Sequence, residues 1–143
     1  MKLHRQSHAV YKTQYHLVWV TRYRRQWLIK GVDAYFRIKL QETRKYYPDW
    51  EFIAVGVDKD HVHLHMIIPP KYSVSKVVET IKKNTSRHLS EKFEFLSKVY
   101  WDREGIWSVG FFASTVGVDE GVIKNYVEWQ GREDEGQAQL ELF

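Results

Sequence analysis

The chain contains no cysteine, no glycine-rich phosphate loop and no long apolar run. The absence of cysteine excludes disulfides, thiolate metal sites and cysteine nucleophiles. No apolar stretch approaches the roughly 18 residues that a membrane-spanning helix needs. Residues 1–6 (Met-Lys-Leu-His-Arg-Gln) also lack the apolar core of a signal peptide. We therefore expect a cytoplasmic protein with no membrane partner.

The chain is instead rich in aromatic and basic residues. Hydrophobic residues make up 43% of its 143 residues and aromatic residues 15%, which is typical of a packed globule of one domain. Residues 1–131 carry a net charge of +7, whereas residues 132–143 hold four acidic residues and one basic residue. We predict a single domain over residues 1–131, followed by an acidic, loosely ordered tail over 132–143. The basic domain indicates a polyanionic partner.

Apolar periodicity predicts an α+β domain with four strands and three main helices. The strands are expected over residues 15–21, 51–57, 61–68 and 107–116. The helices are expected over residues 33–47, from a cap at Ser73 or Ser75 through 89, and over 119–132. Residues 93–106 are expected to form a loop with a short helical piece. The order β-α-β-β-α-β-α predicts a ferredoxin-like plait: a four-stranded antiparallel sheet, helices on one face, and an extra C-terminal helix.

Two histidines one residue apart, His61 and His63, lie inside the apolar run of the third predicted strand. Because side chains alternate along a strand, both imidazoles point to the same face, with Cα atoms about 6–7 Å apart. Such a pair can chelate one cation. The alternative is two histidines on the solvated face of a half-buried strand.

Tyr126 and Gln130 form a second candidate pair in the last predicted helix. Residues four apart lie on one helix face, about 6 Å apart along the axis. A tyrosine can act as a covalent nucleophile, and a glutamine offers a neutral oxygen ligand. The alternative is an ordinary half-buried aromatic residue followed by a solvent-facing amide.

Four sequence blocks in order carry a resemblance to a known family. They are Tyr15 to Arg25 (Tyr-His-Leu-Val-Trp-Val-Thr-Arg-Tyr-Arg-Arg), Asp60-His61-Val62-His63, Ser114-Thr115-Val116-Gly117, and Tyr126 with Gln130. Together they resemble the HUH transposases with a single catalytic tyrosine, of the insertion-sequence 200/605 type. The resemblance extends over about residues 11–131.

The resemblance implies a reaction and a set of site residues. His61, His63 and Gln130 would bind one divalent metal, and Tyr126 would attack a DNA phosphodiester to give a 5′-phosphotyrosine and a free 3′-OH. The substrate would be single-stranded DNA at hairpin-bearing ends of a mobile element, cleaved and rejoined without ATP. The family also implies a homodimer in which the tyrosine helix of one subunit can complete the histidine pair of the other.

The metal is expected to be Mg²⁺ or Mn²⁺. Imidazole ligands alone suggest Zn²⁺, whereas an amide oxygen with open positions for phosphate and water suits Mg²⁺ or Mn²⁺. His65 lies at the next same-face position and raises the alternative of a three-histidine zinc site. Residues four apart on a strand are ~13 Å apart, too far to share one ion with the residue between them. We therefore expect His65 to pack, face DNA or tune the metal indirectly, and Asp60 to be a turn residue.

Two basic clusters are candidates for nucleic-acid binding. They comprise Arg22, Arg24 and Arg25, interleaved with Tyr23 and Trp27, and Lys82, Lys83 and Arg87. Cations beside aromatic rings can hold phosphates and stack unpaired bases. The alternative is a solvated basic surface without a partner.

A symmetric dimer is also expected from the aromatic residues of the last strand, Trp107, Phe111 and Phe112, which would be costly to expose. Gly117 and Gly121 would provide a hinge before the tyrosine helix. Two other functions remain open. One is a host-adopted HUH nickase with the same chemistry, and the other is a non-catalytic module that binds single-stranded nucleic acid and in which the histidines and Tyr126 only pack.

Overall fold

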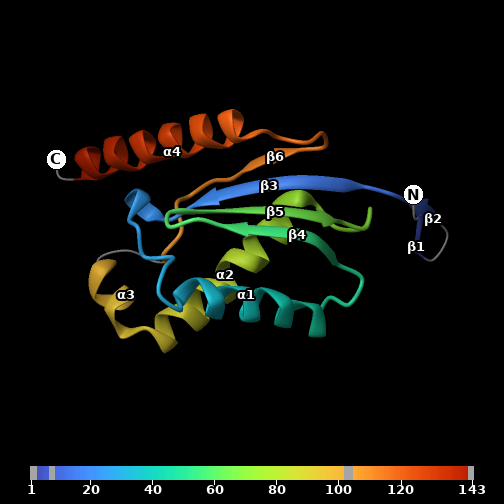
Figure 1. Cartoon of the computed structure of the whole chain (residues 1–143), viewed down its shortest axis with the longest axis horizontal. Coiled ribbons are helices and arrows are strands. Elements are labelled where there is room, and N and C mark those ends of the chain that lie inside the picture. Colours follow the sequence, from blue (N-terminus) through green and yellow to red (C-terminus); the bar gives the residue numbers. More distant parts are fainter. Residues whose placement is uncertain (1–2, 7–8, 102–104, 142–143) are drawn as a thin grey trace.

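A four-stranded antiparallel sheet with helices on both faces forms the body of the protein (Figure 1). The computed structural model describes residues 3–6, 9–101 and 105–141. The strand order is β4 (Glu51–Val57), β5 (His61–Ile67), β3 (Gln14–Val20) and β6 (Phe112–Ser114), and every pair is antiparallel. This order is that of the predicted ferredoxin-like plait.

Helices α1 (Val32–Glu42) and α2 (Val74–Lys92) cover one face of the sheet (Figure 1). Helix α2 begins where predicted, because the Ser73 hydroxyl accepts a hydrogen bond from the Lys76 amide at 3.1 Å. The main core lies between these helices and the alternate strand residues that face them, including the fully buried Leu17, Trp19 and Leu64. The short helices η2 (Thr43–Lys45) and α3 (Glu94–Val99) complete this side, whereas η1 (Arg22–Arg24), which follows β3, contacts α4.

Helix α4 (Glu120–Glu141) crosses the opposite face, over β3 and β6 (Figure 1). The Asp119 carboxylate accepts a hydrogen bond from the Val122 amide at 2.8 Å and so caps the helix start. Among the described residues, the buried apolar side chains of the cluster beneath α4 are Val18, Val20 and Val127. The predicted helix pair and the extra C-terminal helix therefore lie on opposite faces of the sheet.

The last strand is shorter than the predicted range of 107–116. Trp107 forms an isolated bridge with Thr21, and regular pairing resumes only at β6. Between them, residues 108–111 form no regular strand, and Gly110 lies against Gln130 of α4. Of the aromatic side chains expected to need a dimer partner, Trp107 is buried, Phe111 is partly buried against the main core and Phe112 is partly buried beneath α4. The dimer stays a prediction.

Both ends of the chain differ from expectation. A hairpin of β1 (His4–Gln6) and β2 (Ala9–Tyr11), which was not predicted, precedes the sheet. The tail predicted from residue 132 instead continues α4 to Glu141, and Asp134 within it is buried. Residues 142 and 143 of that tail lie outside the described residues. Among those that are described, no helix has the length and apolar character to span a bilayer.

Candidate active site

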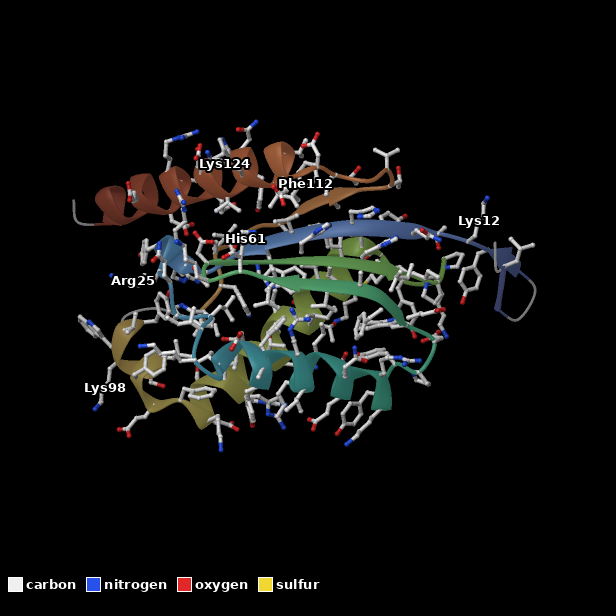
Figure 2. The ribbon with its side chains drawn as sticks, in the orientation of Figure 1. Lys12, Arg25, His61, Lys98, Phe112 and Lys124 are labelled. Carbon is white, nitrogen blue, oxygen red and sulfur yellow. The ribbon has the colours of Figure 1, made fainter. Side chains whose placement is uncertain are left out.

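The histidines of β5 face α4, as strand alternation requires. His61 pairs with Val20 and His63 with Val18, the two strand valines of the cluster beneath that helix. Figure 2 shows His61 on this side of the sheet, below the part of α4 that carries Lys124. Both imidazoles line a cavity of about 580 Å³ between the sheet and α4. The predicted same-face pair is therefore present.

Asp60, predicted as a turn residue, orients the first of these histidines. One carboxylate oxygen of Asp60 lies 2.8 Å from the Nδ1 of His61, and the other lies 3.4 Å from the Nε of Arg24. Burial alone would raise the pKa of Asp60, but the hydrogen bond and charge of His61, together with Arg24, outweigh it and lower the pKa. Because the carboxylate engages Nδ1, the Nε2 of His61 is the nitrogen left for a metal.

His16 belongs to the same cluster, although its position in the sequence gave no spacing signal. Its Nδ1 lies 3.4 Å from the Nε2 of His63, and its ring stacks on His65 at a centroid distance of 4.0 Å. The Nε2 of His65 in turn lies 3.0 Å from the Gln14 side-chain oxygen. Burial and these neighbouring imidazoles lower the pKa of His63, which favours its neutral form. Pairing of the first and third predicted strands could have identified His16, because the same alternation places it opposite His65.

Tyr126 and Gln130 meet on one face of α4, as predicted. The Tyr126 hydroxyl donates to the Gln130 side-chain oxygen at 3.1 Å, and the Gln130 amide nitrogen donates to Asp134 at 3.1 Å. Burial, with the charge of Asp134 adding to it, raises the pKa of Tyr126 above its ordinary value. The phenol in this position is therefore protonated at neutral pH.

The two halves of the predicted site line different cavities beside α4. The cavity that contains His61 and His63 is lined on α4 by Ile123 and Val127, among others. Tyr126 and Gln130 line a second cavity, of about 610 Å³, between α4 and the segment 109–111. Tyr126 packs on the cluster of Val18, Val20 and Val127, but among the described residues no hydrogen bond or ring contact joins Tyr126 or Gln130 to His61 or His63.

The donor set fits a divalent metal if the two halves meet. His61 has Nε2 available, and Gln130 directs its oxygen away from Asp134. Two nitrogen donors and one neutral oxygen leave positions open for phosphate and water, as Mg²⁺ or Mn²⁺ requires. Metal binding through the Nε2 of His63 would replace its long contact with His16. Among the residues described, no group of three or more histidines and carboxylates is placed to hold a metal, so a three-histidine zinc site gains no support.

The predicted basic residues are not equivalent in their surroundings. Arg24 crosses α4 at Gly131, where a Cβ atom would lie 2.4 Å from the arginine Cδ, and then reaches Asp60. Arg25 lies over the Tyr23 ring, while the Arg22 side chain donates to the Gly105 carbonyl. Arg24 thus connects α4 to the histidine side of the sheet.

The basic residues of α2 also differ from one another in their surroundings. The Lys82 ammonium donates to the carbonyls of Ser108 and Gly110, at 2.6 and 3.0 Å. Burial, with the charge of Arg22 adding to it, lowers the pKa of Lys82 to about 8. Lys83 and Arg87 are exposed beside a groove of about 590 Å³ that separates α2 from the segment 105–111. Lys82 therefore holds that segment in place, and DNA contact by these residues stays a prediction.

The sequence of the chain is similar to those of known transposases. The sequence model of the family described as "Transposase IS200 like" matches residues 9–130. The chain belongs to the IS200-like transposase family. It is 31% identical over 140 residues to the transposase of insertion sequence element IS200 from Salmonella typhimurium, covering 95% of this chain and 88% of that protein. It is 27% identical over 122 residues to the ISDra2 transposase TnpA of Deinococcus radiodurans, covering 85% and 86%.

Solved structures agree with this membership. The crystal structure of a candidate transposase from Deinococcus radiodurans matches with a TM-score of 0.77 and 28% identity, covering 91% of this chain and 98% of that one. A REP-associated tyrosine transposase bound to a REP hairpin matches in fold, with a TM-score of 0.55 and 17% identity, covering 89% and 68%. The predicted family and the predicted plait are therefore confirmed.

Proposed function

We propose that the protein is a metal-dependent transposase that cleaves and rejoins single-stranded DNA at hairpin-bearing element ends. The observation that carries the proposal is the pairing of Tyr126 with Gln130 on α4, opposite a sheet face that presents His61 and His63 together. Membership of the IS200-like family supports DNA transposition as the setting. The hairpin bound to the REP-associated relative supports a folded single strand as the substrate.

In the proposed reaction the Tyr126 oxygen forms a bond to phosphorus while the bond from phosphorus to the 3′-oxygen breaks. The products are a 5′-phosphotyrosine and a 3′-OH, and the phenol proton is balanced by the proton gained at the 3′-oxygen. A bound Mg²⁺ or Mn²⁺ would neutralise the phosphate oxygens and stabilise the leaving 3′-oxygen. His61, His63 and Gln130 would hold that metal, and Asp60 would keep the Nε2 of His61 available.

We further propose that the site is completed between two subunits. Tyr126 and Gln130 line one cavity beside α4, whereas the histidines of the same chain line another. The non-helical residues 115–119 precede α4, and Gly117, which has open space around it, is in this connection. Moving α4 to a second copy would remove the burial that raises the pKa of Tyr126.

The test uses labelled single-stranded DNA that carries the ends of the encoding element, with Mn²⁺ and the full chain. The expected product is a covalent protein–DNA adduct on denaturing gels, lost in Tyr126→Phe and in His63→Ala. Tight binding of the hairpin without any adduct from the unmodified chain would instead support a binding module.

Sharing of the site is tested by mixing two inactive variants. Tyr126→Phe retains the histidines and His61→Ala/His63→Ala retains the tyrosine, so a mixed dimer with shared sites contains one intact site. Adduct formation should return on co-expression of the two variants. If each chain used its own histidines and tyrosine, the mixed dimer would remain inactive.

A further inference from the structure

Asp134 is a buried carboxylate in the acidic end of α4, outside every motif of the proposed site. Its side chain is 5% exposed and contacts three segments of the chain. One oxygen accepts from the Gln130 amide nitrogen at 3.1 Å, and the other accepts from the Tyr23 main-chain amide at 2.8 Å and from the Ser108 hydroxyl. Acidic residues are seldom buried, and the three hydrogen-bond donors around Asp134 therefore indicate a specific role for its carboxylate.

We propose that Asp134 is a positioning residue that fixes which end of the Gln130 amide is presented for metal binding. The inference rests on the proposed function, because it concerns the oxygen that would bind the metal. The two ends of a glutamine amide have nearly the same shape but opposite hydrogen-bonding character. Only the oxygen can act as a ligand for Mg²⁺ or Mn²⁺.

A carboxylate can only accept hydrogen bonds, so the amide group of Gln130 must turn its NH₂ toward Asp134. The amide oxygen then points toward the Tyr126 hydroxyl, 3.1 Å away, on the side of the cavity. Gly110 leaves space at this point, since a Cβ atom there would lie 3.1 Å from the Gln130 oxygen. The contact with Asp134 therefore selects the ligand atom.

In the position that α4 has in this structure, the contacts of the second Asp134 oxygen stabilise this orientation of Gln130. The Tyr23 main-chain amide is always a donor, and it meets one carboxylate oxygen of Asp134. The Ser108 hydroxyl contacts the same oxygen and also the Thr21 carbonyl. The Tyr23 amide therefore needs an acceptor at that place. A side-chain amide at position 134 would meet this need with its oxygen and would then face Gln130 with its NH₂.

Asp134→Asn is therefore expected to reverse the orientation of Gln130. The Gln130 oxygen would turn inward to accept from the introduced NH₂, and its own NH₂ would face the metal position. Gln130→Glu added to Asp134→Asn provides a second variant, because a carboxylate has an oxygen at both ends. The double variant retains every hydrogen bond to Tyr23 and Ser108 and keeps the total charge of the original pair.

The experiment measures Mn²⁺ affinity by titration calorimetry on the full chain. Asp134→Asn should lower the affinity by about 10–100-fold, the range found when a group that orients a metal ligand is lost. The double variant Asp134→Asn/Gln130→Glu should return it to within about threefold of the original chain. Glu135→Gln, which removes one charge from an exposed neighbour on the same helix, serves as the control and should not change the affinity.

A second readout is independent of metal. The Gln130 side-chain NH₂ resonances, assigned by Gln130→Ala, should shift in Asp134→Asn and not in Glu135→Gln. Unchanged Mn²⁺ affinity in Asp134→Asn would overturn the inference. A double variant that melts like the original chain but does not regain affinity would also overturn it, because Asp134 would then act only through folding.

Failure of the proposed function gives a different result. In that case Mn²⁺ binding by the original chain would be absent, or would be insensitive to both His61→Ala and Gln130→Ala. If His61→Ala and Gln130→Ala weaken binding and Asp134→Asn does not, only the role of Asp134 is wrong.

Discussion

The two faces of the sheet are built from different interactions. On the face toward α1 and α2, large side chains such as Leu17, Trp19 and Leu64 are completely buried in one continuous core. On the face toward α4, three buried valines are joined by a histidine cluster and by the contacts of Asp134. Hydrophobic burial is strong and non-directional, whereas a polar contact can be remade with an equivalent partner. The first face is thus a permanent scaffold, and the second is suited to a helix that changes position.

The largest effect is expected when one buried side chain on each face of the sheet is truncated to alanine. Leu64→Ala should lower the free energy of unfolding by about 2–5 kcal/mol, because it leaves a cavity in the scaffold core. Val127→Ala, beneath α4, should cost only about 1–2 kcal/mol, as expected for the apolar carbons removed. Urea denaturation measures both changes.

Amide hydrogen exchange is a second measurement that distinguishes the two variants. Val127→Ala should speed amide exchange in α4 while β3 and β5 keep their protection. Equal losses of stability for the two variants, with exchange increased throughout the sheet, would contradict the division into scaffold and mobile helix.

The next effect concerns the polar face and the metal. Asp60→Ala removes the carboxylate that engages the Nδ1 of His61, and we expect Mn²⁺ affinity to fall by about 10–100-fold. Asp58→Ala removes the same charge two residues away, where the carboxylate accepts from the Lys59 amide, and it should leave the affinity unchanged. Equal weakening by the two variants would mean that charge alone, and not orientation of His61, determines binding.

The smallest effect is expected at the surface, where two lysines provide a matched pair. Lys83 and Lys98 have the same 77% side-chain exposure, and each pairs with a glutamate four residues earlier. Neither substitution by alanine should change the free energy of unfolding by more than about 0.5 kcal/mol. Lys83→Ala alone should weaken hairpin binding and reduce the salt-dependence slope by about 1. Equal effects of both variants on binding would remove Lys83 from the proposed DNA surface.

Spacing along single elements was enough to predict much of the fold and the shared face of each candidate pair, His61 with His63 and Tyr126 with Gln130. The strands around Leu17 and His61 alternate cleanly, and Tyr126 with Gln130 follows directly from the helical repeat. The length of the last strand was not predictable in this way. Its apolar composition favours one strand over 107–116, whereas regular pairing is confined to Phe112–Ser114 and Gly110 lies against Gln130 of α4.

Residues that act through distant partners were missed for a physical reason. Asp134 follows Tyr23 by 111 residues and Ser108 by 26, so no local pattern connects them. Its acidic neighbours also predict a solvated tail, because charge is usually exposed. Asp60 fits a turn equally well, and only the structure places its carboxylate on His61.

The placement of Tyr126 and of the histidine pair in different cavities affects how activity would depend on protein concentration. Under the proposed exchange of α4, a lone polypeptide contains no complete site and would not cleave DNA. Competence then depends on encounters between copies, so at low abundance the rate of strand breakage rises with the square of the protein concentration. A mobile element that encodes such a protein would limit its own spread through weak expression alone, with no repressor required.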